Sequence, residues 1–544
     1  MLWACAPERR VEPAASTHQR TAFARAAPLD QARRIRTSDD DLAELADRLP
    51  GFGGYYYDEQ QRLTVWLKDL GRAAEAQAMV ADFLRRRMAR TPALAAASAQ
   101  HTEGMRVRQA SHDFRQLLTW YRGHVLSNVM QLPGITMTDI DERKNRIQIG
   151  VASAEHLEAT RRFVARLPLP AGVVEVLIEQ PAIPSRAGAL DLGRIPFAFT
   201  TQHLSDTLRP VVGGARILIY DPGGYTSCTL GFNLQRWVDN EIQPQRYFTT
   251  AGHCLLDWGT MSSRSVAQPI ASKYIGVEVA DPSFFSCAGV HPNVPASYSC
   301  RHADVGLVLY DSASHADPGR VATPGLGQTS FSSTASITEV FAPEVGRLVE
   351  MVGASSGRLV GTVDRSCAHV RYASEQKFLL CQARASYAGG TGDGGAPVIE
   401  RFGDGSTAWG VGIHWSHTSA GDSWFSPLYS ALNELYATSG LLDPTTSPSE
   451  PPVLPGPPAD FEVSIYGMTL VGPTTECSWT AVVTGGESPL EYTWTGLLNG
   501  TDYYVYGSMT TTGYLHVTVV DALGVERTAS LLIDYDPEAN LDCM

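Results

Sequence analysis

Three short motifs carry residue types that can move protons and bind an oxyanion. In chain order they are Thr250-Ala251-Gly252-His253-Cys254, Asp304-Val305-Gly306-Leu307 and Gly390-Thr391-Gly392-Asp393-Gly394-Gly395-Ala396-Pro397-Val398. An imidazole exchanges protons near neutral pH, and a neighbouring carboxylate can fix its orientation. Glycine-rich turns bring backbone N–H groups close to a bound group. Residues of these types could together move a proton and stabilise a developing negative charge.

These motifs resemble those of the trypsin-like serine proteases, the proteins with the chymotrypsin fold. Their motifs are Thr-Ala-Gly/Ala-His-Cys, Asp-x-Ala/Gly-Leu and Gly-Asp-Ser-Gly-Gly/Ala-Pro, in the order His, Asp, nucleophile. The resemblance covers about residues 211–440 and implies that His253 is a general base oriented by Asp304. It also implies that the backbone N–H groups of Gly392 and Gly394 line an oxyanion hole.

Gly394 stands where this family has its nucleophilic serine. Because glycine has no side chain, no covalent acyl-enzyme can form there, and loss of the serine lowers turnover by about six orders of magnitude. Two nearby hydroxyls, Thr391 and Ser386, could reach His253 only through a changed loop. The sequence therefore predicts a catalytically inactive, peptide-binding pseudoprotease. The alternative within the same class is an active serine protease with a displaced nucleophile.

The family resemblance also indicates where a polypeptide would bind. The stretch 409–416 resembles the strand that lines the primary specificity pocket and pairs with the substrate backbone, so we expect His414, Trp415 and Ser416 to contact a peptide. Ala388 occupies the position where trypsins place an acidic residue. A preference for arginine or lysine is therefore not supported.

The cysteine pattern favours an oxidising compartment. The nine cysteines are Cys5, Cys228, Cys254, Cys287, Cys300, Cys367, Cys381, Cys477 and Cys543. Without Cys5 the set is even, as expected for disulfides in an extracytoplasmic protein, although buried free thiols are the alternative. Streptogrisin-like members of the family imply a Cys228–Cys254 bridge. Proximity along the chain then suggests Cys287–Cys300, Cys367–Cys381 and Cys477–Cys543.

Neither a metal nor a cofactor is expected from the sequence. The cysteines show no Cys-x-x-Cys spacing, and His302 next to Asp304 lacks the further ligands that zinc requires. The net charge of −14 and the isoelectric point near 5.5 give no electrostatic reason to bind nucleic acid or an anionic membrane. Leu2-Trp3-Ala4-Cys5 resembles a bacterial lipobox, which would place a lipid anchor at Cys5, although a chance tetrapeptide fits equally well.

At 544 residues the chain is too long for one core, because domains average about 150 residues. We expect a multidomain protein with an all-β, trypsin-like double β-barrel core, an α+β domain before it and an immunoglobulin-like β-sandwich after it. The expected divisions are a flexible tail at 1–37, the α+β domain at 38–190, the protease domain at 191–440, a proline-rich linker at 441–460 and the sandwich at 461–544.

The α+β domain resembles the prosegments of bacterial extracellular proteases, which assist folding and block the cleft until they are removed. An ordinary accessory domain is the alternative. Ser38 is the expected N-cap of a helix over 42–49. The other elements expected here are a hairpin at 52–57 and 63–67, helices at 73–88 and 112–130, and a strand–helix–strand unit at 146–151, 154–167 and 173–178.

The C-terminal region alternates apolar and polar residues with period two, which is typical of strands. The stretches 485–494 and 519–524 resemble the polycystic-kidney-disease repeats and related Ig-like domains of secreted bacterial enzymes. Such a domain could bind a cell surface, a glycan or a protein. A second function class is therefore a surface adhesion protein in which the protease fold is only a scaffold.

Overall fold

The computed structural model describes residues 35–88, 104–186, 202–221, 224–238, 240–289, 294–295, 297–372, 375–446, 462–473, 477–484, 490–520 and 526–537. Every one of these residues belongs to a single compact unit, 31–544. The tail expected at 1–37 is described only from Ile35, and most of the expected linker lies outside the described residues.

The N-terminal part begins with helix α1, Ser38–Arg48. Its N-cap is Thr37 rather than the predicted Ser38. The Thr37 hydroxyl accepts a hydrogen bond from the backbone N–H of Asp40, and the Asp40 carboxylate accepts one from the backbone N–H of Thr37. This reciprocal pair is a capping box, and it satisfies two backbone donors that a serine at position 38 would leave open.

A small sheet and three helices follow α1. The predicted hairpin is β1, Phe52–Tyr57, paired antiparallel with β2, Leu63–Leu67. Strand β3, Arg106–Gln109, joins β2 in parallel. The helices are α2 (Ala73–Met88), α4 (Phe114–Trp120) and α5 (Ser127–Val129), with a π-helical turn at Tyr121–Leu126 between the last two.

The predicted strand–helix–strand unit lies in a three-stranded extension of the large sheet that also contains β23 (Gly357–Arg371). The strands and helix of this extension are β4 (Ile135–Asp141), β5 (Arg146–Val151), α6 (Ala154–Val164) and β6 (Val174–Ile178). β5 pairs antiparallel with β4 and parallel with β6, and α6 makes the crossover between β5 and β6. The pattern analysis did not predict β4.

The first barrel sheet carries the histidine and aspartate motifs. Its strands are β10 (Arg216–Asp221), β11 (Gly224–Thr229), β12 (Asn233–Val238), β13 (Glu241–Thr250), β14 (Ser265–Ala267), β15 (Tyr274–Ala280), β18 (Gly306–Tyr310) and β28 (Leu441–Asp443). They pair in the order β11-β10-β14-β15-β18-β13-β12-β28. Because β28 pairs antiparallel with β12, residues 441–443 belong to this sheet, and the expected start of the linker at 441 is wrong.

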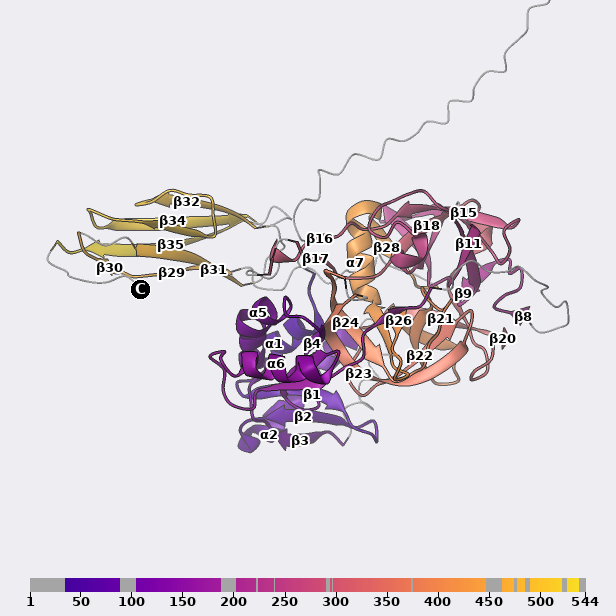
Figure 1. The fold of residues 1–544 in the computed structure, drawn as a ribbon, viewed down its shortest axis with the longest axis horizontal. Helices are drawn as coiled ribbons and strands as arrows, with labels where there is room; N and C mark the ends of the chain where they lie inside the picture. The colour runs from indigo at the N-terminus through magenta and orange to yellow at the C-terminus, as the bar shows by residue number, and fades with distance from the viewer. Residues whose placement is uncertain are drawn as a thin grey trace, which may run out of the picture. The chain divides into compact units, whose positions relative to one another are not determined.

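The second barrel contains β22, β23, β24 and β26, which are labelled in Figure 1, together with β25 and β27. Its strands are β22 (Leu348–Gly353), β23 (Gly357–Arg371), β24 (Lys377–Ala385), β25 (Pro397–Phe402), β26 (Thr407–His417) and β27 (Ser423–Pro427). The antiparallel pairs β22–β23, β23–β24, β24–β27, β27–β26, β26–β25 and β25–β22 complete a ring. Helix α7, Leu428–Ser439, follows this ring directly and covers the predicted helix at 431–437.

The C-terminal part has two sheets around its own apolar core. One sheet pairs β29 (Glu462–Tyr466), β31 (Cys477–Thr484) and β33 (Tyr504–Gly507). The other pairs β30 (Leu470–Val471), β35 (Glu526–Tyr535), β34 (Gly513–Val520) and β32 (Glu491–Gly496). Trp479 and Trp494 are buried in the shared core.

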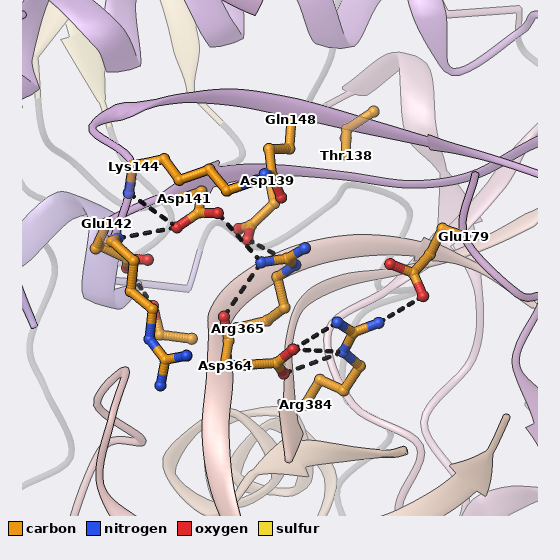
Figure 2. A network of polar contacts seen from close by, with 12 residues as sticks. Thr138, Asp139, Asp141, Glu142, Lys144, Gln148, Glu179, Asp364, Arg365 and Arg384 are labelled. Atoms are coloured by element: carbon orange, nitrogen blue, oxygen red, sulfur yellow. Dashed lines mark hydrogen bonds and ion pairs between the residues drawn. The ribbon is translucent and has the colours of Figure 1, made fainter. Parts of the chain in front are cut away.

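Strand β4 joins the N-terminal part to the second barrel by pairing antiparallel with β23, and charged side chains surround this junction (Figure 2). Arg365 of β23 lies 3.4 Å from Asp139 Oδ2 and 3.5 Å from Asp141 Oδ2. The Ser366 hydroxyl donates to Glu142 Oε1 at 2.5 Å. All five of these side chains are buried. The N-terminal part is therefore bound to the barrel by paired charges as well as by strand hydrogen bonds.

A second ion-pair group fixes the chain just beyond β6 (Figure 2). Arg384 of β24 donates to Glu179 Oε1 at 2.5 Å and to both carboxylate oxygens of Asp364. Glu179 is the residue after β6 and is buried. Burial would lower the pKa of Arg384, but its two carboxylate partners raise it. This anchor sets where the chain leaves the N-terminal part and runs toward the second barrel.

Candidate active site

Strand pairing brings His253 and Asp304 together. His253 lies in a 3-10 turn, Gly252–Leu255, directly after β13, and Asp304 lies just before β18. β13 and β18 pair antiparallel with Thr250 opposite Gly306, so both motifs meet at one end of the sheet. His253 Nδ1 donates to Asp304 Oδ2 at 2.6 Å, and the His253 backbone N–H donates to Asp304 Oδ1 at 2.9 Å. The carboxylate thus fixes the imidazole.

The electrostatics of the pair fit this arrangement. Both side chains are buried, with His253 at 5% and Asp304 at 0% relative exposure. Burial alone would raise the pKa of Asp304, but the charge and hydrogen bonds of His253, together with the nearby Arg301, hold it below its usual value. Asp304 is therefore a carboxylate, and it keeps the Nδ1–H of His253 directed toward itself.

The glycine-rich turn is stabilised by its own aspartate. Asp393 is buried, and its Oδ1 accepts hydrogen bonds from the backbone N–H groups of Ser355 and Ser356, both at 3.0 Å. Its Oδ2 accepts one from Gly390 N–H at 3.0 Å. Gly395, the residue after Gly394, has a φ of +91° and so needs glycine. These contacts fix where the backbone N–H groups of the turn point.

Position 394 faces the imidazole. A Cβ added to Gly394 would lie 2.9 Å from His253 Nε2 and 3.1 Å from Cys254 Sγ. Within the described residues, the only contact of His253 Nε2 that resembles a hydrogen bond is a 3.8 Å approach to Cys254 Sγ. Among the described residues no hydrogen bond joins Thr391 or Ser386 to His253, and the Ser386 hydroxyl accepts from Thr362 N–H at 3.0 Å. A serine at 394 would meet the imidazole, but glycine leaves Nε2 without a nucleophile.

The cleft beside this turn holds a segment of the same chain. Strand β7, Ile183–Pro184, pairs antiparallel with β26, with Pro184 opposite Ser416 and Ile183 opposite His417. The backbone N–H of Ser185 donates to the carbonyl of Trp415 at 2.9 Å. An extended peptide therefore lies along the strand expected to pair with substrate.

The carbonyl of Ser185 lies at the two amides of the glycine-rich turn. Its oxygen accepts hydrogen bonds from the backbone N–H groups of Gly392 and Gly394, both at 2.9 Å. These are the amides expected to bind an oxyanion, and both point to one oxygen atom. A peptide carbonyl held by this pair is polarised toward the charge of a tetrahedral intermediate.

Two imidazoles contact the Ser185 side chain, which is fully buried. Its hydroxyl lies 3.0 Å from His414 Nε2 and 2.9 Å from His417 Nδ1. His414 Nδ1 is 3.3 Å from the hydroxyl of Tyr387. Burial, with smaller effects from neighbouring histidines, lowers the pKa of His414 to about 3, and burial also lowers the pKa of His417. Both rings are accordingly neutral near pH 7 and can share hydrogen bonds with a hydroxyl.

The structure brings most of the expected peptide-binding residues to this segment. His414 contacts the Ser185 side chain, Trp415 accepts its N–H, and Ser416 lies opposite Pro184. Ala388 is exposed and has no described contact with residues 182–186, so the structure does not place it in the pocket. His417, Tyr387 and Ser185 itself escaped the sequence analysis. The His-Trp-Ser-His sequence at 414–417 was the one available signal for His417.

The structure confirms the disulfides Cys228–Cys254, Cys287–Cys300 and Cys367–Cys381. Cys477 is disulfide-bonded, whereas Cys5 and the expected partner Cys543 lie outside the described residues. Over the described ranges, no group of three or more His, Cys, Asp or Glu side chains is arranged to hold a metal ion. No helix within them is long and apolar enough to cross a membrane.

Comparison with known proteins finds likeness among solved structures alone. No family model and no curated protein matches the chain. Protease A of Thermobifida fusca aligns with 22% identity over 43% of this chain and 98% of its own, at a TM-score of 0.30. A glutamic acid-specific serine protease aligns with 24% identity over 41% of this chain and 96% of its own, at a TM-score of 0.29. Nocardiopsis protease aligns with 20% identity over 41% of this chain and 94% of its own, at a TM-score of 0.28. These neighbours are trypsin-like serine proteases, and each covers less than half of this chain.

Proposed function

We propose that this chain is a catalytically inactive homologue of trypsin-like serine proteases that binds an extended peptide in its cleft. One observation supports this most directly. The Ser185 carbonyl accepts hydrogen bonds from the N–H groups of Gly392 and Gly394. Gly394 nevertheless offers no nucleophile to that carbonyl. A bound peptide is therefore held in the geometry of a substrate and is not cleaved.

The N-terminal domain acts as a retained prosegment in this proposal. Residues 182–186, near the end of this domain, lie in the cleft, and the β4–β23 pairing docks the domain on the second barrel. In an active protease, hydrolysis of a peptide bond in this segment would release the segment from the cleft. With glycine at 394 the block persists, and any ligand in trans must displace residues 182–186.

An extracytoplasmic location is part of the proposal. Three buried disulfides within the barrel region require an oxidising compartment to form and persist. A lipid anchor at Cys5 would hold the protein at a bacterial surface and remains a sequence-based prediction. Mass spectrometry of the mature protein from its host tests both, since lipidation changes the mass of the N-terminal peptide.

The decisive test of inactivity is a fluorophosphonate activity probe. Such probes label a serine that is activated by a neighbouring base. The chain with Gly394 should remain unlabelled, whereas the Gly394→Ser variant should be labelled at residue 394. Labelling of the chain with Gly394 at any hydroxyl would contradict the proposal, and mapping the labelled peptide would identify the displaced nucleophile.

A second candidate function, surface adhesion, is favoured by exposed tyrosines in the C-terminal part. Tyr504 and Tyr506 of β33 are 38% and 63% exposed, and their rings stack with centroids 6.3 Å apart. Exposed aromatic faces are amphipathic and serve glycan or protein ligands. Replacing both tyrosines by alanine in the full chain should abolish binding to host cell-wall preparations if this function holds. Unchanged binding would show that these tyrosines do not contact the cell-wall ligand.

A further inference from the structure

One ring nitrogen of His253, Nε2, makes no hydrogen bond shorter than 3.8 Å among the described residues. Nδ1 is bonded to Asp304, while Nε2 has only the 3.8 Å contact with Cys254 Sγ among the described residues. The ring is 5% exposed, so bulk water satisfies this nitrogen poorly. A buried polar atom without a partner costs free energy that a bound acceptor would recover. Because Nδ1–H is donated to Asp304, Nε2 carries a proton only when the ring is an imidazolium, and in that form it needs an acceptor that the peptide in the cleft does not supply.

The position of that acceptor follows from the bound segment. In the serine-protease reaction, the histidine gives its proton to the amine that leaves from the carbonyl held in the oxyanion hole. Here that carbonyl belongs to Ser185, and the corresponding nitrogen is the backbone N of Arg186. An amide nitrogen cannot accept a hydrogen bond from Nε2. An oxygen in the same place could.

We infer that the cleft is a receptor for the free C-terminal carboxylate of a peptide whose last residue lies where Ser185 lies. One carboxylate oxygen accepts from the N–H groups of Gly392 and Gly394, as the Ser185 carbonyl does. The second oxygen takes the place of the Arg186 nitrogen and accepts from Nε2–H of His253, whose ring is then an imidazolium with Nδ1–H donated to Asp304. This inference rests on the proposed function, and it names the ligand of the same site.

Glycine at position 394 suits this ligand. A Cβ there would already lie 3.0 Å from the Ser185 oxygen and 2.9 Å from His253 Nε2. A serine hydroxyl would extend farther into the same space and compete for Nε2. Without it, a carboxylate meets two backbone amides and the Nε2–H of an imidazolium, and its charge strengthens each of these hydrogen bonds.

The segment in the cleft also indicates which residues such a ligand carries. Its last side chain must be small and able to hydrogen-bond, because the Ser185 hydroxyl is enclosed by His414 and His417. Pro184 shows that the residue before it needs no N–H, and Ile183 is 45% exposed, so that position is open to many side chains. Ala182 is buried at 4% exposure and requires a small residue.

The experiment compares two labelled peptides on the full-length chain. Both carry Gln-Pro-Ala-Ile-Pro-Ser, the sequence of 180–185, and one ends in a free carboxylate while the other ends in an amide. The chain carries Ser185→Pro, which removes the N–H donated to Trp415 and the buried hydroxyl and so weakens the binding of the segment in the cleft. By fluorescence anisotropy, the carboxylate peptide should bind at least about tenfold more tightly, as expected for one charge-assisted hydrogen bond.

His253→Gln in the same chain should bring the carboxylate peptide to the affinity of the amide. His516→Gln, a histidine of the C-terminal part, is the matched control and should preserve the difference. If both peptides bind equally well, the carboxylate inference is wrong and the proposed peptide cleft remains. If neither binds while hydrogen exchange shows the amides of residues 392 and 394 exposed, the proposed function itself is wrong. Should Ser185→Pro fail to fold, the Ile183→Gly/Ser185→Gly variant makes the same comparison.

Discussion

The carbonyl oxygen of Ser185 lies 2.9 Å from the backbone nitrogen of Gly394, which donates a hydrogen bond to it. In a working serine protease this amide would stabilise the charge that develops during attack by the side chain of the same residue. Here the residue supplies the amide and lacks the side chain. The contact therefore joins the end of the N-terminal domain to the second barrel.

Restoring the nucleophile should make the chain cleave itself. In Gly394→Ser, the new hydroxyl lies beside His253 and next to the Ser185 carbonyl, so the Ser185–Arg186 bond becomes the scissile bond. We expect two fragments, 1–185 and 186–544, by intact-mass spectrometry. Gly394→Ala adds a similar Cβ without a hydroxyl and should stay intact. A Gly394→Ser chain that labels with a fluorophosphonate but stays whole would contradict this assignment of the bond.

Removing the carboxylate of Asp304 should destabilise the first barrel. Asp304→Ala leaves the backbone N–H and the Nδ1 of His253 without their buried acceptor. Breaking a buried charged pair on one side costs about 3 kcal/mol or more of unfolding free energy. Urea denaturation measures the loss, and Glu59→Ala, an exposed residue of the β1–β2 turn, should change it by less than about 0.5 kcal/mol. Equal effects of the two substitutions would argue against a structural pair.

Docking of the N-terminal domain should weaken as the pH rises. The pKa of Glu142 is raised to about 7, chiefly by burial and to a smaller extent by the charge of Asp141. The hydrogen bond from Ser366 and the charge of Arg365 lower this pKa, but burial outweighs them. A carboxyl whose folded-state pKa is raised favours the folded state most below its ordinary pKa of 4.5. That contribution is lost as the pH rises from there to about 7.

Glu142→Gln tests this directly, because glutamine keeps the hydrogen bond with Ser366 and does not titrate. Thermal melting between pH 4.5 and 8 should show a smaller decline in the variant than in the natural chain. Asp139, whose pKa is raised chiefly by burial and which faces Arg365, contributes a decline of the same sign in both proteins. Identical pH profiles for the two proteins would contradict the assignment to Glu142.

The pocket around Ser185 should have the opposite pH dependence. Burial lowers the pKa of His414 from 6.5 to about 3, so the unfolded chain binds this proton before the folded one does. Stability should therefore fall as the pH drops from 6.5 toward 3. His414→Gln retains a hydrogen-bonding group near the Ser185 hydroxyl and removes the titration, so its denaturation midpoint should fall less over that range. A histidine NMR titration showing His414 protonated at pH 5 would refute this.

The sequence predicted the site from its local motifs. His253, Asp304 and the glycine-rich turn lie as expected because each motif encodes its own turn, and the pairing of β13 with β18 joins them. Three disulfides formed as expected, since each joins neighbouring cysteines along the chain. Short-range sequence patterns were therefore sufficient to predict these motifs and disulfides.

Strand β4 shows where those patterns fail. Its seven residues are all buried, including Asp139 and Asp141, because β5 pairs with it on one side and β23 on the other. Its acidic residues resemble a surface segment in the sequence, and only their burial against Arg365 explains them. An ion pair between distant segments leaves no local signal.

By itself, then, the sequence determined the local motifs that hold His253, Asp304 and the glycine-rich turn with Gly394. Only the tertiary structure decided what fills the cleft. The sequence of residues 182–186 resembles any other extended stretch that contains proline, and only the pairing of β7 with β26 places it there. The tertiary structure also decided that His414 and His417 both contact the Ser185 hydroxyl. Residues three apart on a regular strand point to opposite faces, and the register shift between His414 and Ser416 is what lets His414 and His417 reach the same hydroxyl.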